Sequence, residues 1–221
     1  MDFELSDEQR EFQQAARAFA EGELAPHAAH WDAESIFPVE TIAKAGEMGF
    51  CGLYTPQRWG GLGLSRQDAA IVFEELAGGC TSTTAYITIH NMATWMLSRW
   101  GQEALCDEWV PALAAGQKLA SYCLTEPQSG SDAASLRTKA VRDGDFYVLD
   151  GTKAFISGAG QTDMLIVMAR TGGEGAAGIS AFAVPANLPG IVYGKKEEKM
   201  GWNSQPTRII SFDQVKVPVG N

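Results

Sequence analysis

The first half of the chain places its apolar residues at the spacing of amphipathic helices. Ser6-Asp7-Glu8-Gln9 fits a capping box, and apolar residues then recur every three to four positions until Pro26 interrupts the pattern. Pro38 and Ser65 are suited to open two later helices. The pattern predicts helices over residues 6–25, 38–49, 65–79, 82–100 and 101–116. In the fourth, the residues expected to face inward are Ala85, Ile89, Met92, Ala93 and Met96.

After Lys118 the apolar positions recur at a period close to two, as in β-strands. Asp143-Gly144 favours a type I′ hairpin and Asp150-Gly151 suggests a second turn, so residues 138–157 are expected to form a three-stranded meander. The predicted strands cover residues 119–124, 138–142, 145–149, 153–157, 165–169, 179–184, 208–212 and 215–217. Such even spacing without helices favours an antiparallel barrel or sandwich. The expected fold is therefore an all-α domain over residues 1–117 followed by an antiparallel β-domain over residues 118–221.

Composition and charge narrow the classes of function. Of the 221 residues, 45% are apolar and 20% are charged, as in soluble globular proteins. The net charge of −10 lies in the first part, because residues 1–118 hold 7 basic and 17 acidic side chains and residues 119–221 hold 10 of each. Neither part offers the positive field that nucleic acid requires. The longest apolar run, Met164–Ala169, is far shorter than the roughly 20 residues of a membrane span, and the acidic start does not resemble a leader peptide.

Several simpler chemistries are not expected. The four cysteines show no CxxC spacing and His27 with His30 has no second ligand pair nearby, which argues against a metal site or a disulfide framework. The glycine-rich stretches 60–63 and 158–160 lack the third glycine of a dinucleotide fingerprint and are interpreted as loops. His90 lies in the middle of a predicted helix, so we expect a packed, hydrogen-bonded histidine rather than a base.

One stretch carries a more specific chemical signal. Between Tyr122 and Asp132 a predicted strand ends at Pro127 and enters a turn whose serine, glycine and aspartate residues can hold backbone N–H groups outward. Outward amides suit an electron-rich edge of a ligand. From the residue chemistry alone, a well-capped surface turn is the alternative interpretation.

The same stretch resembles the flavin-binding signature of the acyl-CoA dehydrogenase family. Cys123–Asp132 looks like that signature, and Phe155-Ile156-Ser157 looks like the family's aromatic-x-Ser/Thr flavin triplet. The resemblance covers nearly the whole chain, and residues 83–92, 155–160 and 201–208 look most like the isobutyryl-CoA dehydrogenase branch. It implies an N-terminal helical domain and a middle β-domain, which a C-terminal helical bundle would follow.

By this resemblance the chain would bind FAD. The implied cofactor-binding residues are Tyr122, Cys123, Leu124, Thr125, Gly130, Ser131, Phe155, Ile156 and Ser157. Leu124 and Thr125 would hydrogen-bond the polar edge of the isoalloxazine, where preorganised donors stabilise the charge of the reduced ring. Phe155 would cover one face of the flavin, and Ser157 would lie by its reactive edge. Ser131 would reach both the cofactor and the acyl-CoA substrate, and Tyr86 is a further implied substrate contact.

The resemblance also implies that the catalytic base lies outside this chain. The family's catalytic carboxylate removes the α-proton while a hydride passes to FAD, and it belongs to the C-terminal bundle, whereas the chain stops at Asn221. No catalytic residue is therefore expected here, and Glu126 is interpreted as structural. The chain is expected to be an incomplete part of an enzyme.

Partners and location follow from the same resemblance. We expect an acyl-CoA substrate, electron-transfer flavoprotein as the acceptor, and a homo-oligomer, a tetramer by resemblance. The expected location is the cytoplasm in a bacterium or, after processing, the mitochondrial matrix in a eukaryote. One alternative is an acyl-CoA oxidase or flavin monooxygenase of the same fold, which would pass electrons to oxygen. Another is a flavin-binding module without catalytic activity.

Substrate size is a final expectation. In this family the helix matching residues 82–96 lines the acyl tunnel, and here it offers Tyr86, Ile87, Ile89 and Met92. These bulky side chains would close the tunnel early and favour short, branched acyl groups over straight chains of about eight or more carbons. If they faced the helical core instead, they would set stability and leave specificity alone.

Overall fold

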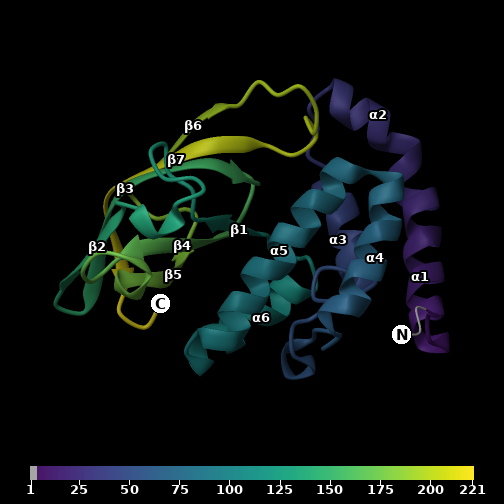
Figure 1. The fold of residues 1–221 in the computed structure, drawn as a ribbon, viewed down its shortest axis with the longest axis horizontal. Helices are drawn as coiled ribbons and strands as arrows, with labels where there is room; N and C mark the ends of the chain where they lie inside the picture. The colour runs from purple at the N-terminus through teal and green to yellow at the C-terminus, as the bar shows by residue number, and fades with distance from the viewer. Residues whose placement is uncertain (1–3) are drawn as a thin grey trace.

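The computed structural model describes residues 4–221 of the chain. Helices form the first part and a curled β-sheet forms the second, with helices α5 and α6 nearest to the sheet (Figure 1). The predicted order of a helical domain followed by a β-domain is confirmed. The α-helices are α1 (Asp7–Phe19), α2 (Ala25–Ala33), α3 (Val39–Glu47), α4 (Arg66–Gly79), α5 (Thr81–Trp100) and α6 (Glu103–Ala114).

Two of these helices begin with the capping interactions that their sequences predict. The Ser6 hydroxyl accepts the Gln9 N–H, and the Gln9 side chain accepts the Ser6 N–H. Ser65 and Asp68 form the same reciprocal pair at the start of α4. Each pair satisfies N–H groups that a helix start leaves without an intrahelical partner.

Pro26 does not interrupt the helical path, so this prediction is wrong. A π-helical turn over Ala20–Leu24 joins α1 directly to α2. Pro26 lies in the first turn of α2, the position at which a proline's missing N–H is best tolerated. The turn packs tightly against α4, because a Cβ on Gly79 would lie only 2.6 Å from the Ala20 carbonyl oxygen.

The predicted inward face of α5 is also largely wrong. Of the five residues expected to face inward, only Ala93 is buried, and the other four are half-buried. The buried face instead holds Tyr86 and Ile87 together with the polar residues His90 and Asn91. Hydrophobic spacing misses this face because the His90 and Asn91 side chains are hydrogen-bonded, and a hydrogen-bonded polar group can be buried at little cost.

Asn91 illustrates how that polar face is satisfied. Its side-chain oxygen accepts the Leu53 N–H at 2.9 Å, and its amide nitrogen donates to the Phe50 carbonyl at 2.7 Å. The segment between α3 and α4 has little regular structure, so its backbone groups need such partners. Asn91 therefore holds this connection against α5.

The second part is a seven-stranded sheet. Its strands are β1 (Ala120–Cys123), β2 (Lys139–Asp143), β3 (Phe146–Ser157), β4 (Met164–Arg170), β5 (Ile179–Pro185), β6 (Ile191–Lys196) and β7 (Thr207–Pro218). The order across the sheet is β1-β4-β2-β3-β7-β6, with β5 paired to β4. The pairing is mainly antiparallel, as predicted, but β1 and β2 each pair in parallel with β4.

Four details of the strand prediction need correction. Asp150-Gly151 is not a turn, because β3 continues through it as one twelve-residue strand with an irregular register between Leu149 and Gly151. The segments 208–212 and 215–217 likewise belong to one strand, β7, and β6 was not predicted. The hairpin at Asp143-Gly144 is confirmed, but positive φ occurs at Gly144 and not at Asp145, which is the type II′ pattern rather than type I′.

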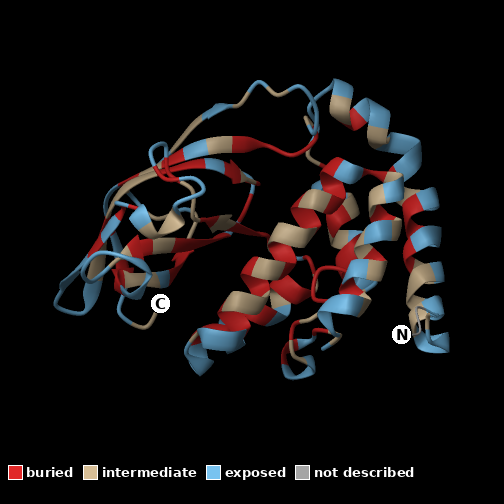
Figure 2. Cartoon of the chain, viewed as in Figure 1, coloured by how far each residue is buried: buried red, intermediate tan, exposed pale blue. Residues whose placement is uncertain are grey.

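Three groups of buried apolar residues hold the molecule together (Figure 2). One fills the helical part and another lies within the curled sheet. The third joins the two parts, since it packs Leu97 of α5 and Val110 of α6 against Met164 and Ile166 of β4. A continuous apolar interface of this kind fixes the position of α5 relative to the sheet.

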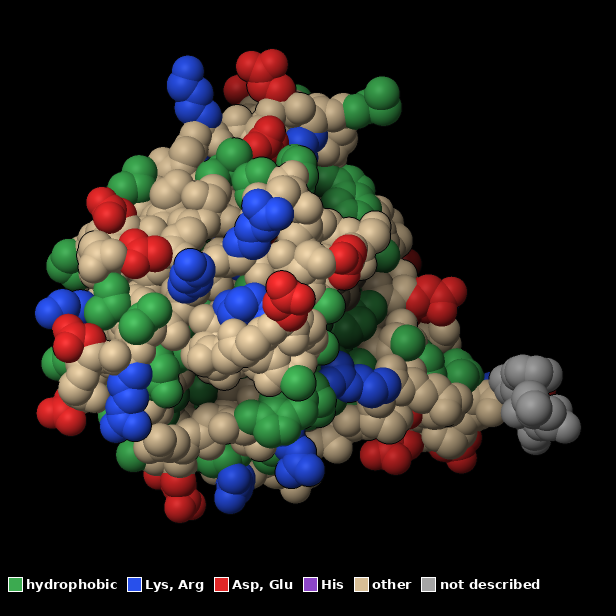
Figure 3. Space-filling model, turned by 60° about the vertical axis from the view of Figure 1, so that its left-hand side comes forward, with side chains coloured by type: hydrophobic (Ala, Val, Ile, Leu, Met, Phe, Trp, Pro, Cys, Tyr) green, Lys and Arg blue, Asp and Glu red, His purple; other side chains and the backbone are tan. Residues whose placement is uncertain are grey.

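The surface over the sheet is mixed in charge. Lysine, arginine and acidic side chains are interspersed on the face that Figure 3 shows, rather than gathered by sign. Among residues 4–221, no helix is long and apolar enough to cross a membrane. The four cysteines are all buried and free of disulfide bonds.

Candidate functional site

A pocket of about 170 Å³ brings the two signature segments together. Its lining residues are Ile89, Tyr122, Leu124, Thr125, Phe155, Ile156 and Ser157. They come from the middle of α5, from β1 with the residues that follow it, and from the end of β3. Six of the nine predicted cofactor residues therefore share one surface with a residue of the predicted acyl tunnel.

Phe155 owes its outward position to a bulge in β3. The pairing with β7 shifts register between Lys153 and Ile156, and Phe155 adopts a left-handed backbone conformation with a φ of 57°. In a regular strand, Lys153 and Phe155 would point to the same face. Here Lys153 is fully buried and Phe155 is 65% exposed, which presents the aromatic ring to the pocket.

Two hydroxyl groups in the pocket are available to a ligand. Within residues 4–221, neither the Thr125 hydroxyl nor the Ser157 hydroxyl has a hydrogen-bond partner. The backbone of Ser157 is held in place, because its carbonyl accepts the Ser121 hydroxyl at 2.6 Å. The site thus combines an exposed aromatic ring with fixed, unused polar groups.

The turn after β1 is organised around the Glu126 carboxylate. It accepts the backbone N–H groups of Arg137 and Thr138 at 2.6 and 2.8 Å and forms a 2.8 Å ion pair with Lys153. Burial alone would raise the pKa of Glu126, but the bonds from Lys153, Thr138 and Arg137 outweigh it and lower that pKa. These contacts hold the turn together, as the structural interpretation of Glu126 predicts.

Three predicted cofactor residues do not line this pocket. Cys123 is fully buried beneath it, and burial raises the pKa of its thiol to about 12. Gly130 and Ser131 lie on the exposed part of the turn. Their predicted contacts with a cofactor remain predictions.

Tyr86 lies in the core rather than at the pocket. It is fully buried, and its hydroxyl donates to the Ala120 carbonyl at 3.1 Å. A Cβ on Gly158 would lie 2.5 Å from the Tyr86 ring, so the residue after Ser157 packs directly on it. The described residues therefore leave no surface of Tyr86 for a substrate, and the core alternative fits Tyr86 and the fully buried Ile87.

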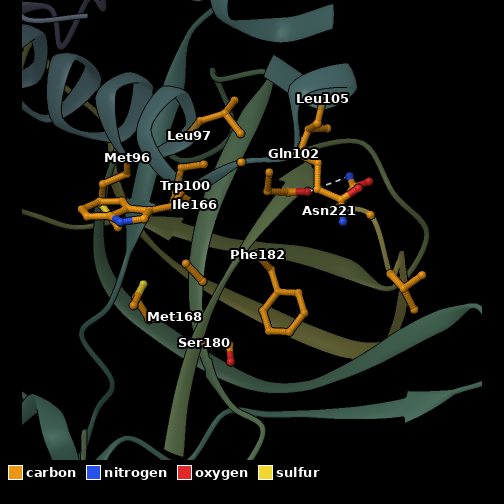
Figure 4. Close-up of a pocket in the computed structure, with 15 residues that line it drawn as sticks. Met96, Leu97, Trp100, Gln102, Leu105, Ile166, Met168, Ser180, Phe182 and Asn221 are labelled. Carbon is orange, nitrogen blue, oxygen red and sulfur yellow. Dashed lines mark hydrogen bonds between the residues drawn. The ribbon is translucent and has the colours of Figure 1, made fainter. Parts of the chain in front are cut away.

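A larger pocket of about 570 Å³ lies elsewhere (Figure 4). It lies between the end of α5 and the start of α6 on one side and β4 and β5 on the other. Trp100, Met168 and Phe182 supply much of its apolar wall. None of its lining residues belongs to either signature segment. Size alone therefore does not identify the functional site, and the smaller pocket holds the more specific chemistry.

The comparison with family models identifies the family to which both parts of the chain belong. Residues 6–117 match the acyl-CoA dehydrogenase N-terminal domain, and residues 121–215 match the acyl-CoA dehydrogenase middle domain. The chain belongs to the acyl-CoA dehydrogenase family. Both signature segments fall within the matched middle domain.

Individual acyl-CoA dehydrogenases agree with this assignment. The chain is 55% identical over 217 residues to the mitochondrial isobutyryl-CoA dehydrogenase of Bos taurus and 50% identical over 218 residues to that of Dictyostelium discoideum. Each alignment covers 98% of this chain and 52% of the relative. A glutaryl-CoA dehydrogenase from Mycobacterium smegmatis in complex with FADH2 superimposes with a TM-score of 0.91 at 28% identity, covering 98% of this chain and 55% of that one. The chain thus spans about half the length of the curated acyl-CoA dehydrogenases that it matches.

One residue behind the candidate site is not predicted from the sequence. Lys153 lies between the two signature segments and pairs with Glu126, yet it was assigned only to a strand. The sequence signal that indicates a paired lysine is its position directly before Ala154, Phe155 and Ile156. A charged residue in an apolar strand segment is either exposed or paired with an opposite charge.

Proposed function

We propose that this chain forms the flavin-binding half of an FAD-dependent dehydrogenase that acts on a short, branched acyl-CoA. The observation that carries the proposal is the meeting of both signature segments on one pocket, with an exposed aromatic ring and two unused hydroxyls. Membership of the acyl-CoA dehydrogenase family and similarity to two isobutyryl-CoA dehydrogenases support the reaction and the substrate class.

The residues of the pocket fit a flavin. The 65% exposed ring of Phe155 offers a flat apolar surface, and the Thr125 and Ser157 hydroxyls lie on the same pocket as donors for a polar ring edge. FAD bound there would accept the hydride that leaves the β-carbon of the substrate. Leu124, Thr125 and Ser157 would orient the ring and stabilise the negative charge that develops on it. Ser131, on the exposed part of the turn, would reach toward the cofactor and the thioester.

The proton-abstracting base of the complete enzyme would lie outside residues 1–221. General base catalysis requires a group within hydrogen-bond reach of the α-proton. Glu126, the acidic residue of the signature, is buried, and its carboxylate already accepts four hydrogen bonds. The complete enzyme would be a homo-oligomer, in the cytoplasm of a bacterium or the mitochondrial matrix of a eukaryote, and would pass its electrons to electron-transfer flavoprotein.

FAD binding is the first test. We expect the complete protein, purified and incubated with FAD, to retain a yellow flavin spectrum after gel filtration and to bleach on addition of isobutyryl-CoA without oxygen. A preparation that remains colourless would contradict the flavin site. Rapid reoxidation of the reduced protein by oxygen would favour an oxidase or monooxygenase, and bound FAD that no acyl-CoA reduces would favour a non-catalytic module.

The second test concerns the size of the acyl group. Ile89 lines the pocket beside the flavin segments, so its side chain is placed to limit the space for an acyl chain. We expect Ile89→Ala to raise kcat/KM for octanoyl-CoA relative to isobutyryl-CoA by about ten-fold or more, since one methylene of fit is worth about 1–3 kcal/mol. The measurement is kcat/KM across straight and branched acyl-CoA substrates.

Ile87 supplies the matched control for this test. It is fully buried in the helical core and lies two residues before Ile89 on the same helix. Ile87→Ala should lower stability by about 2–5 kcal/mol while leaving the substrate ratio unchanged. A wild-type preference for long straight chains, or equal ratios in the two variants, would rule out Ile89 as the limit of the acyl site.

A further inference from the structure

The two flavin segments are joined by a buried ion pair. Lys153 is fully buried, its ammonium lies 2.8 Å from the Glu126 carboxylate, and the side chain of Glu126 is 1% exposed. Lys153 is separated by one residue from Phe155, and Glu126 directly follows Thr125. Neither charged group lines the pocket, so both lie behind the residues that do.

Lys153 also determines the orientation of a peptide group at the pocket. Its ammonium donates a second hydrogen bond, at 3.0 Å, to the carbonyl of Leu124. The C=O and N–H of a trans peptide point in opposite directions. The N–H of Thr125 therefore points away from the buried ammonium, and Thr125 itself lines the pocket. Lys153 thus presents this N–H as a donor.

The segment of β3 beside the pocket is held by the same arrangement. The Ala154 N–H donates to the Thr125 carbonyl at 2.8 Å, so Lys153 and Ala154 bind consecutive carbonyls of the first segment. Phe155 follows at once with its left-handed φ of 57°. A non-glycine residue in that conformation is strained and persists where its neighbours are fixed.

Stability alone does not account for a charged pair at this position. Removing two charges from water is costly, and well-packed apolar residues of similar volume often replace a buried ion pair without loss of stability. The Glu126–Lys153 pair has a full set of partners, since Glu126 also accepts the N–H groups of Arg137 and Thr138 ahead of β2. Such a saturated pair fixes geometry with high precision.

We propose that Glu126 and Lys153 are positioning residues that hold the Thr125 N–H and the Phe155 ring in register for the flavin, without touching it. The inference rests on the proposed flavin site. It predicts that the protein still folds when both charges are removed together. Flavin binding, in contrast, should require the pair.

The test uses the double variant Glu126→Gln/Lys153→Met of the complete protein, in which no unpaired charge remains buried. We expect it to fold with a moderately lower thermal unfolding temperature, because a glutamine amide keeps only one of the two oxygens that accept the Arg137 and Thr138 N–H groups. Its Kd for FAD should rise by about ten-fold to a hundred-fold, the range found for groups that orient ligands at metal sites. The visible spectrum of the bound flavin should also shift, which a purely structural role would not cause.

Two further variants make the result unambiguous. Glu126→Asp keeps the charge but shortens the side chain, so it should fold and still weaken FAD binding, even if the double variant does not fold. Glu75→Gln/Arg17→Met removes an ion pair of the same 2.8 Å length between α4 and α1, which is more exposed and lies away from the pocket, and should leave FAD binding unchanged.

Each outcome has a definite meaning. A wild-type protein that binds no FAD would overturn the flavin site and the positioning role together. A wild-type protein that binds FAD, with Glu126→Asp or a folded double variant retaining the same Kd and spectrum, would overturn the positioning role alone. Weaker binding with an altered flavin spectrum in these variants, and not in the Arg17 control, supports it.

Discussion

Ser157→Ala is expected to slow reduction of the flavin by about 10²–10³-fold, the loss measured when one preorganised donor to a developing charge is removed. The Ser157 hydroxyl lines the pocket and has no partner elsewhere in residues 4–221, so it is free to donate to a bound ring. Its backbone is anchored by Ser121, which keeps the donor fixed. The measurement is single-turnover reduction of the bound FAD by isobutyryl-CoA.

Two companion variants separate this effect from a change in folding. Ser157→Thr retains a hydroxyl and should recover part of the rate. Ser211→Ala alters a half-buried serine on β7 that does not line the pocket and should change neither the rate nor the unfolding temperature. An unchanged reduction rate in a folded Ser157→Ala protein would remove Ser157 from the site.

Acid is expected to destabilise the protein through His90. Burial lowers the pKa of His90 from 6.5 to about 4, although its bond to Leu113 and the charge of Asp163 act in the opposite direction. Its Nδ1 accepts the Ala120 N–H at 3.0 Å, which leaves Nε2 to donate to the Leu113 carbonyl at 2.9 Å and defines a neutral ring.

The sign of the pH effect follows from this depressed pKa. Below pH 6.5 the unfolded chain binds a proton that the folded chain does not bind until about pH 4, so the free energy of unfolding decreases as the pH falls through this window. The full shift corresponds to about 3 kcal/mol at 1.36 kcal/mol per pKa unit. Urea unfolding near pH 7 and near pH 4.5 should reveal most of this loss.

The variant His90→Gln tests whether the histidine is responsible. It carries no titrating group, so its stability should decline by about 2–3 kcal/mol less than the wild type over the same pH interval. Carboxyl groups whose pKa values are lowered by folding, such as Glu126, contribute equally to both proteins and cancel in the difference. Parallel pH profiles for the two proteins would exclude His90 as the acid-sensitive group.

The sequence predicts most elements of this fold, and its errors have physical causes. Capping residues such as Ser6 and Ser65 act locally, so they identify helix starts reliably. Gly151 misleads because glycine and aspartate occur both in turns and in strand irregularities, and only the pairing of β3 with β7 distinguishes the two. The face of α5 misleads because Asn91 and His90 are buried through bonds to segments far away in the chain.

In the candidate site, too, some residues can be predicted from the sequence and others cannot. The motifs predict the pocket residues Tyr122, Leu124 and Thr125 and the segment from Phe155 to Ser157, because their types and order are specific. The contribution of Lys153 was not, since its role depends on a partner 27 residues away. The position of Tyr86 could not be deduced either, because a tyrosine on an amphipathic helix suits a tunnel and a core equally.

The bonds around Ala120 bear on how this chain can be divided. The Tyr86 hydroxyl and the His90 ring both bind the backbone of Ala120, the first residue of β1. A gene fragment ending at residue 117, where the matched N-terminal domain ends, would leave both groups without these partners and expose the α5–α6 side of the apolar interface. We therefore expect a fragment that extends through β1 and its partner strand β4 to be more stable in isolation than one that ends at residue 117.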